Sequence, residues 1–215
     1  MELKRENGII LALDVETREK ALEICREVVD FVDGIKVGYP LILNTDLSVI
    51  GELGQFKKPV IADLKVADIP FVSKKICESA VKSGADYVIV HGFAGEDVVK
   101  ACSSAVKIFV VAEMSHVGAE EFMAKDALAI TEIARKYAVG IVAPATRPQR
   151  IKELRKAVGD LLIISPGVKA QGAEIGDATR AGADFEIIGR GIYRAENPEK
   201  VAEEFSKIIR SLGKI

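Results

Sequence analysis

Several residue types are rare or missing in this chain of 215 residues, and each shortage excludes a class of protein. Trp is absent, and only two His and three Cys are present. Cys25, Cys77 and Cys102 are odd in number and far apart, so they predict neither a disulfide framework nor a zinc ribbon. All three fall in segments with helical periodicity, where we expect buried or semi-buried thiols in a reducing cytoplasm. His116 has no second His or Cys at metal-ligand spacing, so no metal or other cofactor is expected.

Long apolar runs and an excess of one charge are also missing. No apolar stretch approaches the roughly 20 residues that a bilayer span needs, and the charged segment Met1–Asn7 has no signal-peptide core. The 30 Lys and Arg residues nearly balance the 32 Asp and Glu residues, for a formal net charge of −2. This balance argues against nucleic-acid partners. We therefore expect a cytoplasmic globular protein that binds neither membrane nor nucleic acid.

The sequence does contain one pattern repeated eight times, a short apolar run followed by a longer amphipathic segment. The runs are rich in Ile and Val and alternate weakly, which is typical of strands buried on both faces. They are Ile9–Leu13, Ile35–Val37, Val60–Leu64, Tyr87–Val90, Ile108–Ala112, Gly140–Ala143, Leu161–Ile164 and Glu186–Ile188. The helical segments are Thr17–Phe31, Leu41–Leu53, Ile69–Ser83, Gly95–Ala105, Ala119–Tyr137, Pro148–Val158, Gly172–Ala181 and Pro198–Leu212. The order predicts an α/β fold, a (β/α)8 TIM barrel, as a single domain over residues 1–215. The alternative is a doubly wound open sheet, which the count of eight disfavours.

Polar residues gather where the predicted strands end, which is where TIM barrels carry their active sites. Asp14 follows the first strand, Lys36 lies on the second, and Asp63 and Lys65 end the third. Because Asp63 and Lys65 are two residues apart, they face the same side, which is the barrel mouth if Leu64 packs against the helices. Buried charges persist only when they are paired. We therefore expect a cluster of lysines and carboxylates that keeps Lys65 protonated, ready to donate a proton to a developing carbanion.

A structural ion-pair network is the alternative explanation of these charges, and a predicted phosphate site weighs against it. Pro166-Gly167 and Gly189-Arg190-Gly191 end the seventh and eighth strands, and they offer backbone N–H groups and a guanidinium to a phosphate. Ordinary turn chemistry is the alternative for these glycines. At the rim, we expect His91 to be a hydrogen-bonded structural residue. Ser115 lacks a nucleophile elbow, so a hydrogen-bonding role is favoured over nucleophilic catalysis.

These segments resemble the archaeal type of orotidine 5'-monophosphate decarboxylase. The most specific match is Ile61–Pro70, which carries the family's Asp-x-Lys-x-x-Asp signature at Asp63, Lys65 and Asp68. Further matches follow in family order, one for each strand end. They are Leu11–Asp14, Ile35–Pro40, Glu113–His116, Ala143–Pro148, Ser165–Val168 with Gln171-Gly172, and Gly189-Arg190 with Ile192-Tyr193.

The resemblance implies that the chain converts orotidine 5'-monophosphate (OMP) to UMP and CO2 in pyrimidine biosynthesis, without metal or cofactor. It implies that Lys65 protonates C6 of the pyrimidine, that Asp63 lies beside the departing carboxylate, and that Lys36 and Asp14 bind ribose hydroxyls. Asp68 would enter the site of the neighbouring subunit, which requires a homodimer. The other implied ligand contacts are an apolar pocket near CO2 at Ile69, the pyrimidine amide edge at Ser115, and the phosphate end at Pro166, Gln171, Gly189 and Arg190.

Two positions depart from the family pattern, and two alternatives remain. Val72 stands where a Thr often reaches the partner's ligand, and Val117 replaces a Pro in the lid region. Magnesium-dependent relatives, 3-keto-L-gulonate 6-phosphate decarboxylase and hexulose 6-phosphate synthase, share the signature. They place an acidic metal ligand where this chain has Lys36, whose charge repels Mg²⁺. A catalytically silent barrel that only binds a phosphorylated ligand is the other alternative, and the intact Asp63 and Lys65 argue against it.

Overall fold

Eight parallel strands close into a barrel in the computed structural model, which describes residues 1–213. Each strand pairs with the next along the chain, and β1 also pairs with β8. The strands are β1 Ile9–Leu13, β2 Gly34–Gly38, β3 Val60–Val66, β4 Tyr87–His91, β5 Lys107–Val111, β6 Gly140–Val142, β7 Leu162–Pro166 and β8 Phe185–Ile188. The closed barrel confirms the (β/α)8 prediction over the open sheet. The domain predicted for residues 1–215 extends two residues beyond the described range.

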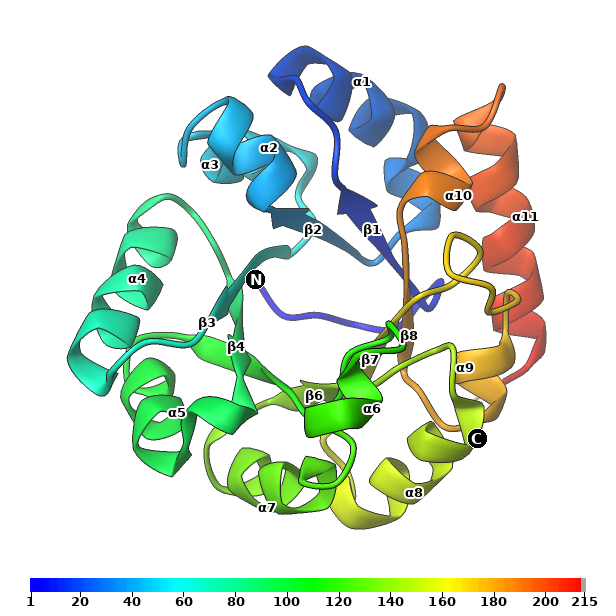
Figure 1. The fold of residues 1–215 in the computed structure, drawn as a ribbon. Coiled ribbons are helices and arrows are strands. Elements are labelled where there is room, and N and C mark those ends of the chain that lie inside the picture. The colour runs from blue at the N-terminus through cyan, green and yellow to red at the C-terminus, as the bar shows by residue number, and fades with distance from the viewer. Residues whose placement is uncertain (214–215) are drawn as a thin grey trace.

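The helices surround the strands, as Figure 1 shows. They are α1 Arg18–Val28, α2 Tyr39–Asn44, α3 Val49–Leu53, α4 Pro70–Lys82, α5 Glu96–Ser103, α6 Ala119–Phe122, α7 Ala127–Tyr137, α8 Pro148–Val158, α9 Asp177–Arg180, α10 Arg190–Tyr193 and α11 Pro198–Ser211. Cys25, Cys77 and Cys102 lie on α1, α4 and α5, and all three are buried free thiols, as expected. None of the helices in residues 1–213 combines the length and apolar character needed to cross a bilayer.

Both faces of each strand are buried, which explains the nearly continuous apolar runs in the sequence. On β1, Ile9, Leu11 and Leu13 belong to the cluster between strands and helices, whereas Ile10 and Ala12 belong to the cluster inside the barrel. Side chains from most of the other strands fill the same interior, including Ile61, Tyr87, Phe109, Val142, Ile164 and Phe185. The barrel is therefore packed, and its open space lies at one end.

The predicted helix Leu41–Leu53 is wrong as a continuous element, because it divides into α2 and α3. Thr45 Oγ1 donates to the Leu41 carbonyl at 2.7 Å, and the Asp46 carboxylate accepts from the Ser48 N–H at 2.7 Å. Side chains of this kind compete with the helix for its backbone groups and favour turns. The break therefore follows from the short polar residues between the two apolar stretches.

Two further predicted helices are shorter in the structure. Ala119–Tyr137 divides into α6 and α7, with the Ala124 N–H bonding back to the Ala119 carbonyl at the break. Gly172–Ala181 is helical only over α9, because Gly172 and Gly176 have φ angles of +99° and +89°. Such left-handed residues end a right-handed helix. The four-residue helix α10, which is separated from β8 only by Gly189, was not predicted.

Candidate active site

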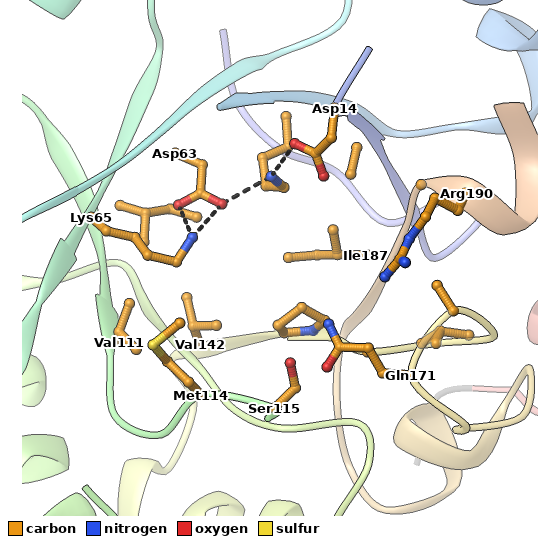
Figure 2. Close-up of a pocket in the computed structure, with 18 residues that line it drawn as sticks. Asp14, Asp63, Lys65, Val111, Met114, Ser115, Val142, Gln171, Ile187 and Arg190 are labelled. Carbon is orange, nitrogen blue, oxygen red and sulfur yellow. Dashed lines mark hydrogen bonds and ion pairs between the residues drawn. The ribbon is translucent and has the colours of Figure 1, made fainter. Parts of the chain in front are cut away.

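A cavity of about 200 Å³ opens at the C-terminal ends of the strands. Nine of the eleven predicted site residues line it: Asp14, Lys36, Asp63, Lys65, Ser115, Pro166, Gln171, Gly189 and Arg190. They lie on, or within a few residues after, six different strands, so only barrel closure brings them together. Figure 2 shows charged side chains on two sides of this cavity and apolar side chains between them.

Four charged side chains form a row of ion pairs across the ends of β1, β2 and β3. Lys65 Nζ donates to both carboxylate oxygens of Asp63, at 2.8 and 2.9 Å. Asp63 also pairs with Lys36 at 2.9 Å, and Lys36 Nζ lies 3.7 Å from Asp14. The Lys36 and Asp63 side chains are each only 8 % exposed, whereas Lys65 is 35 % exposed. Positive and negative charges therefore alternate, which is how buried charges are stabilised.

This alternation of charges determines the protonation states of the two central residues, Lys36 and Asp63. Burial would raise the pKa of Asp63, but Lys36 and then Lys65 outweigh it and lower that pKa to about 2. Burial would lower the pKa of Lys36, but Asp63 and Asp14 outweigh it, and the Lys36 pKa is raised. Both groups are therefore charged at neutral pH.

The end of β3 departs from a regular strand. Leu64 packs in the cluster between barrel and helices, and Asp63 and Lys65 line the cavity, as strand alternation predicted. Lys65, however, has a φ of +41°, in the left-handed region that non-glycine residues rarely adopt. The pairing of β3 with β4 shifts register between Ala62 and Val66. The predicted orientation is thus reached through a local distortion that the sequence did not reveal.

An apolar wall lies beside the charges, and sequence reasoning missed it. Ile89, Val111, Met114, Val142 and Ile187 all line the cavity. Val111 and Val142 are the last residues of β5 and β6, Ile187 is the second-to-last residue of β8, and Ile89 is the third-to-last residue of β4. The alternation that placed Asp63 in the mouth also places these residues there, so the same signal could have found them. The wall gives a flat, weakly polar ligand a surface to lie against.

Arg190 and Gln171 lie on the side of the cavity opposite Lys65 (Figure 2). Both side chains are exposed, and Pro166 and Gly189 line the cavity beside them. A Cβ on Gly189 would lie 3.1 Å from the Ala12 carbonyl, so a larger residue would push β8 away from β1. A cationic guanidinium next to closely approaching backbone fits a phosphate group.

Comparison with known proteins agrees with the family resemblance of the sequence. The family model described as "Orotidine 5'-phosphate decarboxylase / HUMPS family" matches residues 7–205. An orotidine 5'-phosphate decarboxylase of Methanosarcina mazei is 53% identical over 97% of this chain and 98% of its own length. That of Methanosarcina acetivorans is 50% identical, with 97% of each chain covered. The crystal structure of orotidine 5'-monophosphate decarboxylase from Methanocaldococcus jannaschii, complexed with inhibitor BMP, has a TM-score of 0.90 at 44% identity. It covers 94% of this chain and 98% of that chain.

The chain belongs to the orotidine 5'-phosphate decarboxylase / HUMPS family. This confirms the family that the strand-end segments resemble.

Of the family signature, Asp63 and Lys65 line the cavity, but Asp68 and the adjacent Ile69 do not. They belong to a shallow depression that also contains Phe93. Ile69 is 63% exposed and Phe93 is 59% exposed, and Phe71 nearby on α4 is 71% exposed. One chain of this family member therefore brings together nine of the predicted residues and leaves two on an apolar outer face.

Two other rim residues have surroundings that the sequence did not indicate. Glu113 lies two residues after the end of β5 but does not line the cavity, and it is fully buried between Arg147 at 2.9 Å and Arg150 at 2.8 Å. His91 was expected to be hydrogen-bonded, yet within residues 1–213 its Nδ1 is buried without a partner. Burial, and then the charge of Lys65, lowers the His91 pKa to about 4. The imidazole is therefore neutral beside the charge cluster.

The two departures from the family pattern lie outside the cavity, with Val117 83% exposed and Val72 half-buried on α4.

Proposed function

We propose that this family member decarboxylates orotidine 5'-monophosphate to UMP and CO2, through a carbanion at C6 that Lys65 protonates. The observation that carries the proposal is the layout of the cavity. Lys65 and Asp63 lie at one side, Arg190 and Gln171 at the other, and an apolar wall lies between them. A nucleotide has matching parts, with a phosphate at one end, a flat base at the other and a ribose in the middle. The names of the relatives support the same reaction.

The proposed proton donor is the Lys65 ammonium. Loss of CO2 from C6 leaves an electron pair in the plane of the ring, where the ring gives it little resonance stabilisation. Catalysis must therefore come from charges fixed in place before the reaction, of the kind that supply a large part of the roughly 8–23 kcal/mol by which enzymes lower barriers. Two hydrogen bonds to Asp63 fix the Lys65 ammonium. The positive charge stabilises the developing carbanion, and one N–H proton is then transferred to C6.

The carboxylates and Lys36 have distinct proposed roles. Asp63 is ionised and buried, so it repels the substrate carboxylate next to it, and this repulsion is relieved as CO2 departs. The apolar wall gives neutral CO2 a better environment than the carboxylate had. Lys36 and Asp14 are placed to bind the ribose hydroxyls, because Asp14 is 41% exposed at the cavity edge and Lys36 donates from beneath.

The phosphate end is proposed to bind a part of the substrate that does not react. Arg190 contributes charge, Gly189 contributes backbone and Pro166 contributes shape, while Gln171 and Ser115 both lie close to Gly167 and can contact phosphate and the pyrimidine amide edge. Gly167 helps Ser115 to approach, because its φ is +110° and a Cβ there would lie 3.1 Å from the Ser115 Cβ. Binding energy from the phosphate can then be used to order the loops over the base.

The proposed reaction uses no metal. An ammonium, that of Lys36, occupies the space between the carboxylates of Asp14 and Asp63, and it repels a divalent cation from the pair that would otherwise bind one. This argues against the magnesium-dependent reactions considered as alternatives. The experiment is to add OMP with excess EDTA and to follow the ultraviolet band of the pyrimidine. We expect full turnover. Binding of OMP without turnover would instead support the silent barrel, and loss of turnover that Mg²⁺ restores would support a metal-dependent relative.

We further propose that the chain is a single domain that acts as a cytoplasmic homodimer with Asp68 shared across the interface. Asp68 and Ile69 belong to an exposed face with Phe71 and Phe93, and a second copy of the chain would cover these apolar side chains. That copy would place its Asp68 near this chain's Lys65, and its Ile69 would extend the apolar wall. Three free thiols on the helices agree with a reducing compartment.

A further inference from the structure

We propose that Tyr39 is a positioning residue that fixes Lys65 through the carbonyl oxygen of Leu64. The inference rests on the proposed role of Lys65 as proton donor and adds a residue to that site. Tyr39 is the first residue of α2 and follows Gly38, the last residue of β2. Its hydroxyl donates a hydrogen bond of 2.6 Å to the Leu64 carbonyl, which belongs to the peptide bond joining Leu64 to Lys65.

This peptide bond lies where β3 lacks the support of its neighbouring strands. The pairing of β3 with β2 ends at Asp63, which lies opposite Gly38. The pairing with β4 stops at Ala62 and resumes only at Val66. Leu64 and Lys65 are therefore paired with neither strand. A backbone carbonyl in this region needs another hydrogen-bond donor, and Tyr39 supplies it.

Lys65 also has a backbone conformation that requires such support. Its φ of +41° lies in the left-handed region, which is strained for a residue with a side chain and persists only when the surroundings impose it. A relaxation of this peptide bond would redirect the Lys65 side chain, because the direction of Cβ follows from φ and ψ. The hydrogen bond from Tyr39 opposes that relaxation one bond away from Lys65.

Tyr39 is well suited to this role and contributes little to packing. Its side chain is largely outside the core, with the residue 48% exposed, so removal of the hydroxyl leaves no cavity. Burial of the hydroxyl and the negative charge of Asp63 raise the Tyr39 pKa, which keeps the hydroxyl protonated and able to donate. Because Tyr39 follows directly after β2, the same hydrogen bond fixes the end of β3 relative to the strand that carries Lys36.

The experiment compares Tyr39→Phe with a matched control, Tyr137→Phe. The Tyr137 hydroxyl donates to Glu96 on the surface of the barrel, and neither of these residues lines the cavity. We expect Tyr39→Phe to lower kcat about 10- to 100-fold, since displacement of a reacting group by about 1 Å costs up to about 100-fold. We expect KM for OMP, Kd for UMP and Tm to be unchanged, and Tyr137→Phe to match the wild type. A crystal structure of Tyr39→Phe should show Lys65 Nζ displaced from its 2.8 Å contact with Asp63.

Three outcomes would overturn the inference. They are an unchanged kcat, an increased KM at constant kcat, and a variant that is unfolded at the assay temperature, which would make the hydroxyl a determinant of folding. Lys65→Ala is measured in parallel to separate this inference from the proposed function. Wild-type turnover by Lys65→Ala would contradict the proposed function itself. An inactive Lys65→Ala alongside a fully active Tyr39→Phe would contradict only the role of Tyr39.

Discussion

At the scale of single residues, Lys65 is the group on which the proposed chemistry depends most. About a third of its side chain is exposed to the cavity. Its ammonium donates two hydrogen bonds to the buried carboxylate of Asp63. We predict that Lys65→Ala abolishes turnover, with a loss larger than the roughly 10²- to 10⁴-fold typical of a proton donor, because the stabilising charge is lost as well. The measurement is kcat with OMP, with Kd for UMP and Tm as checks that the fold survives.

Lys20→Ala is the matched control for Lys65→Ala. Lys20 lies on α1 and pairs with Glu23 at the surface, so its loss should leave kcat at the wild-type value. If Lys65→Ala retained wild-type kcat, protonation at C6 would have to come from another group, and the assignment of the proton donor would fail.

Arg190 lies at the other side of the cavity, where we propose that it binds a part of the substrate that does not react. We predict that Arg190→Ala raises KM and lowers kcat/KM for OMP about 10- to 150-fold, the equivalent of the roughly 1.5–3 kcal/mol of a hydrogen bond to a charged group. Orotidine lacks the phosphate, so kcat/KM for orotidine should not change in this variant. Arg180→Ala, which removes an exposed arginine paired with Asp177, is the control. An unchanged KM for OMP would count against the phosphate role.

At the scale of structural elements, the pair of Lys36 and Asp63 ties β2 to β3 inside the mouth. The fold lowers the Asp63 pKa to about 2, compared with roughly 3.9 for an unfolded Asp. A carboxyl with a lowered pKa stabilises the fold fully above its unfolded pKa, and the contribution is lost as the pH falls from about 4 through 2. At neutral pH the difference between the folded and unfolded pKa values of Asp63 corresponds to about 2–3 kcal/mol of folding stability.

We therefore predict that Asp63→Asn lowers Tm at pH 7, because the buried Lys36 ammonium keeps only Asp14, at 3.7 Å, as a partner. The gap in Tm between the wild type and Asp63→Asn should narrow as the pH is lowered toward 2, where the wild-type carboxyl also becomes neutral. Thermal unfolding followed by circular dichroism between pH 7 and pH 2 measures both effects. Glu23→Gln, at a surface ion pair, should leave Tm unchanged. A gap that stayed constant with pH would show that the charge of Asp63 does not stabilise the fold.

The element scale also shows what the sequence could predict. Strands were located correctly to within one or two residues at most ends, because burial on both faces leaves a strong apolar signal, as in Ile9–Leu13. Helix breaks at Gly172 and Gly176 were missed, because a glycine in a helical period does not reveal its φ. The left-handed Lys65 was missed for a related reason. It results from the lost pairing between β3 and β4, which is a tertiary feature.

At the scale of the whole molecule, the predicted site residues divide between two surfaces. Asp14, Lys36, Asp63 and Lys65 meet in the cavity, because barrel closure determines where strand ends lie, and the order of strands was readable from the sequence. Asp68, three residues beyond Lys65, lies instead on the outer apolar face. No strand or helix period predicts which surface meets a second copy of the chain. The sequence alone, read for periodicity, therefore could not place Asp68, and only the family signature suggested a shared site.

Hybrid dimers test whether Asp68 acts across the interface. We predict that Lys65→Ala and Asp68→Asn are each nearly inactive, and that mixing equal amounts under conditions of subunit exchange restores activity. If Asp68 serves the partner's site, each mixed dimer contains one site with Lys65 from one chain and Asp68 from the other, both intact. Random exchange makes half of the dimers mixed, so the mixture should recover about a quarter of wild-type kcat per site. If Asp68 serves its own chain, every site in the mixture lacks one of the two groups. The mixture would then be as inactive as its components, although sedimentation would still detect dimers.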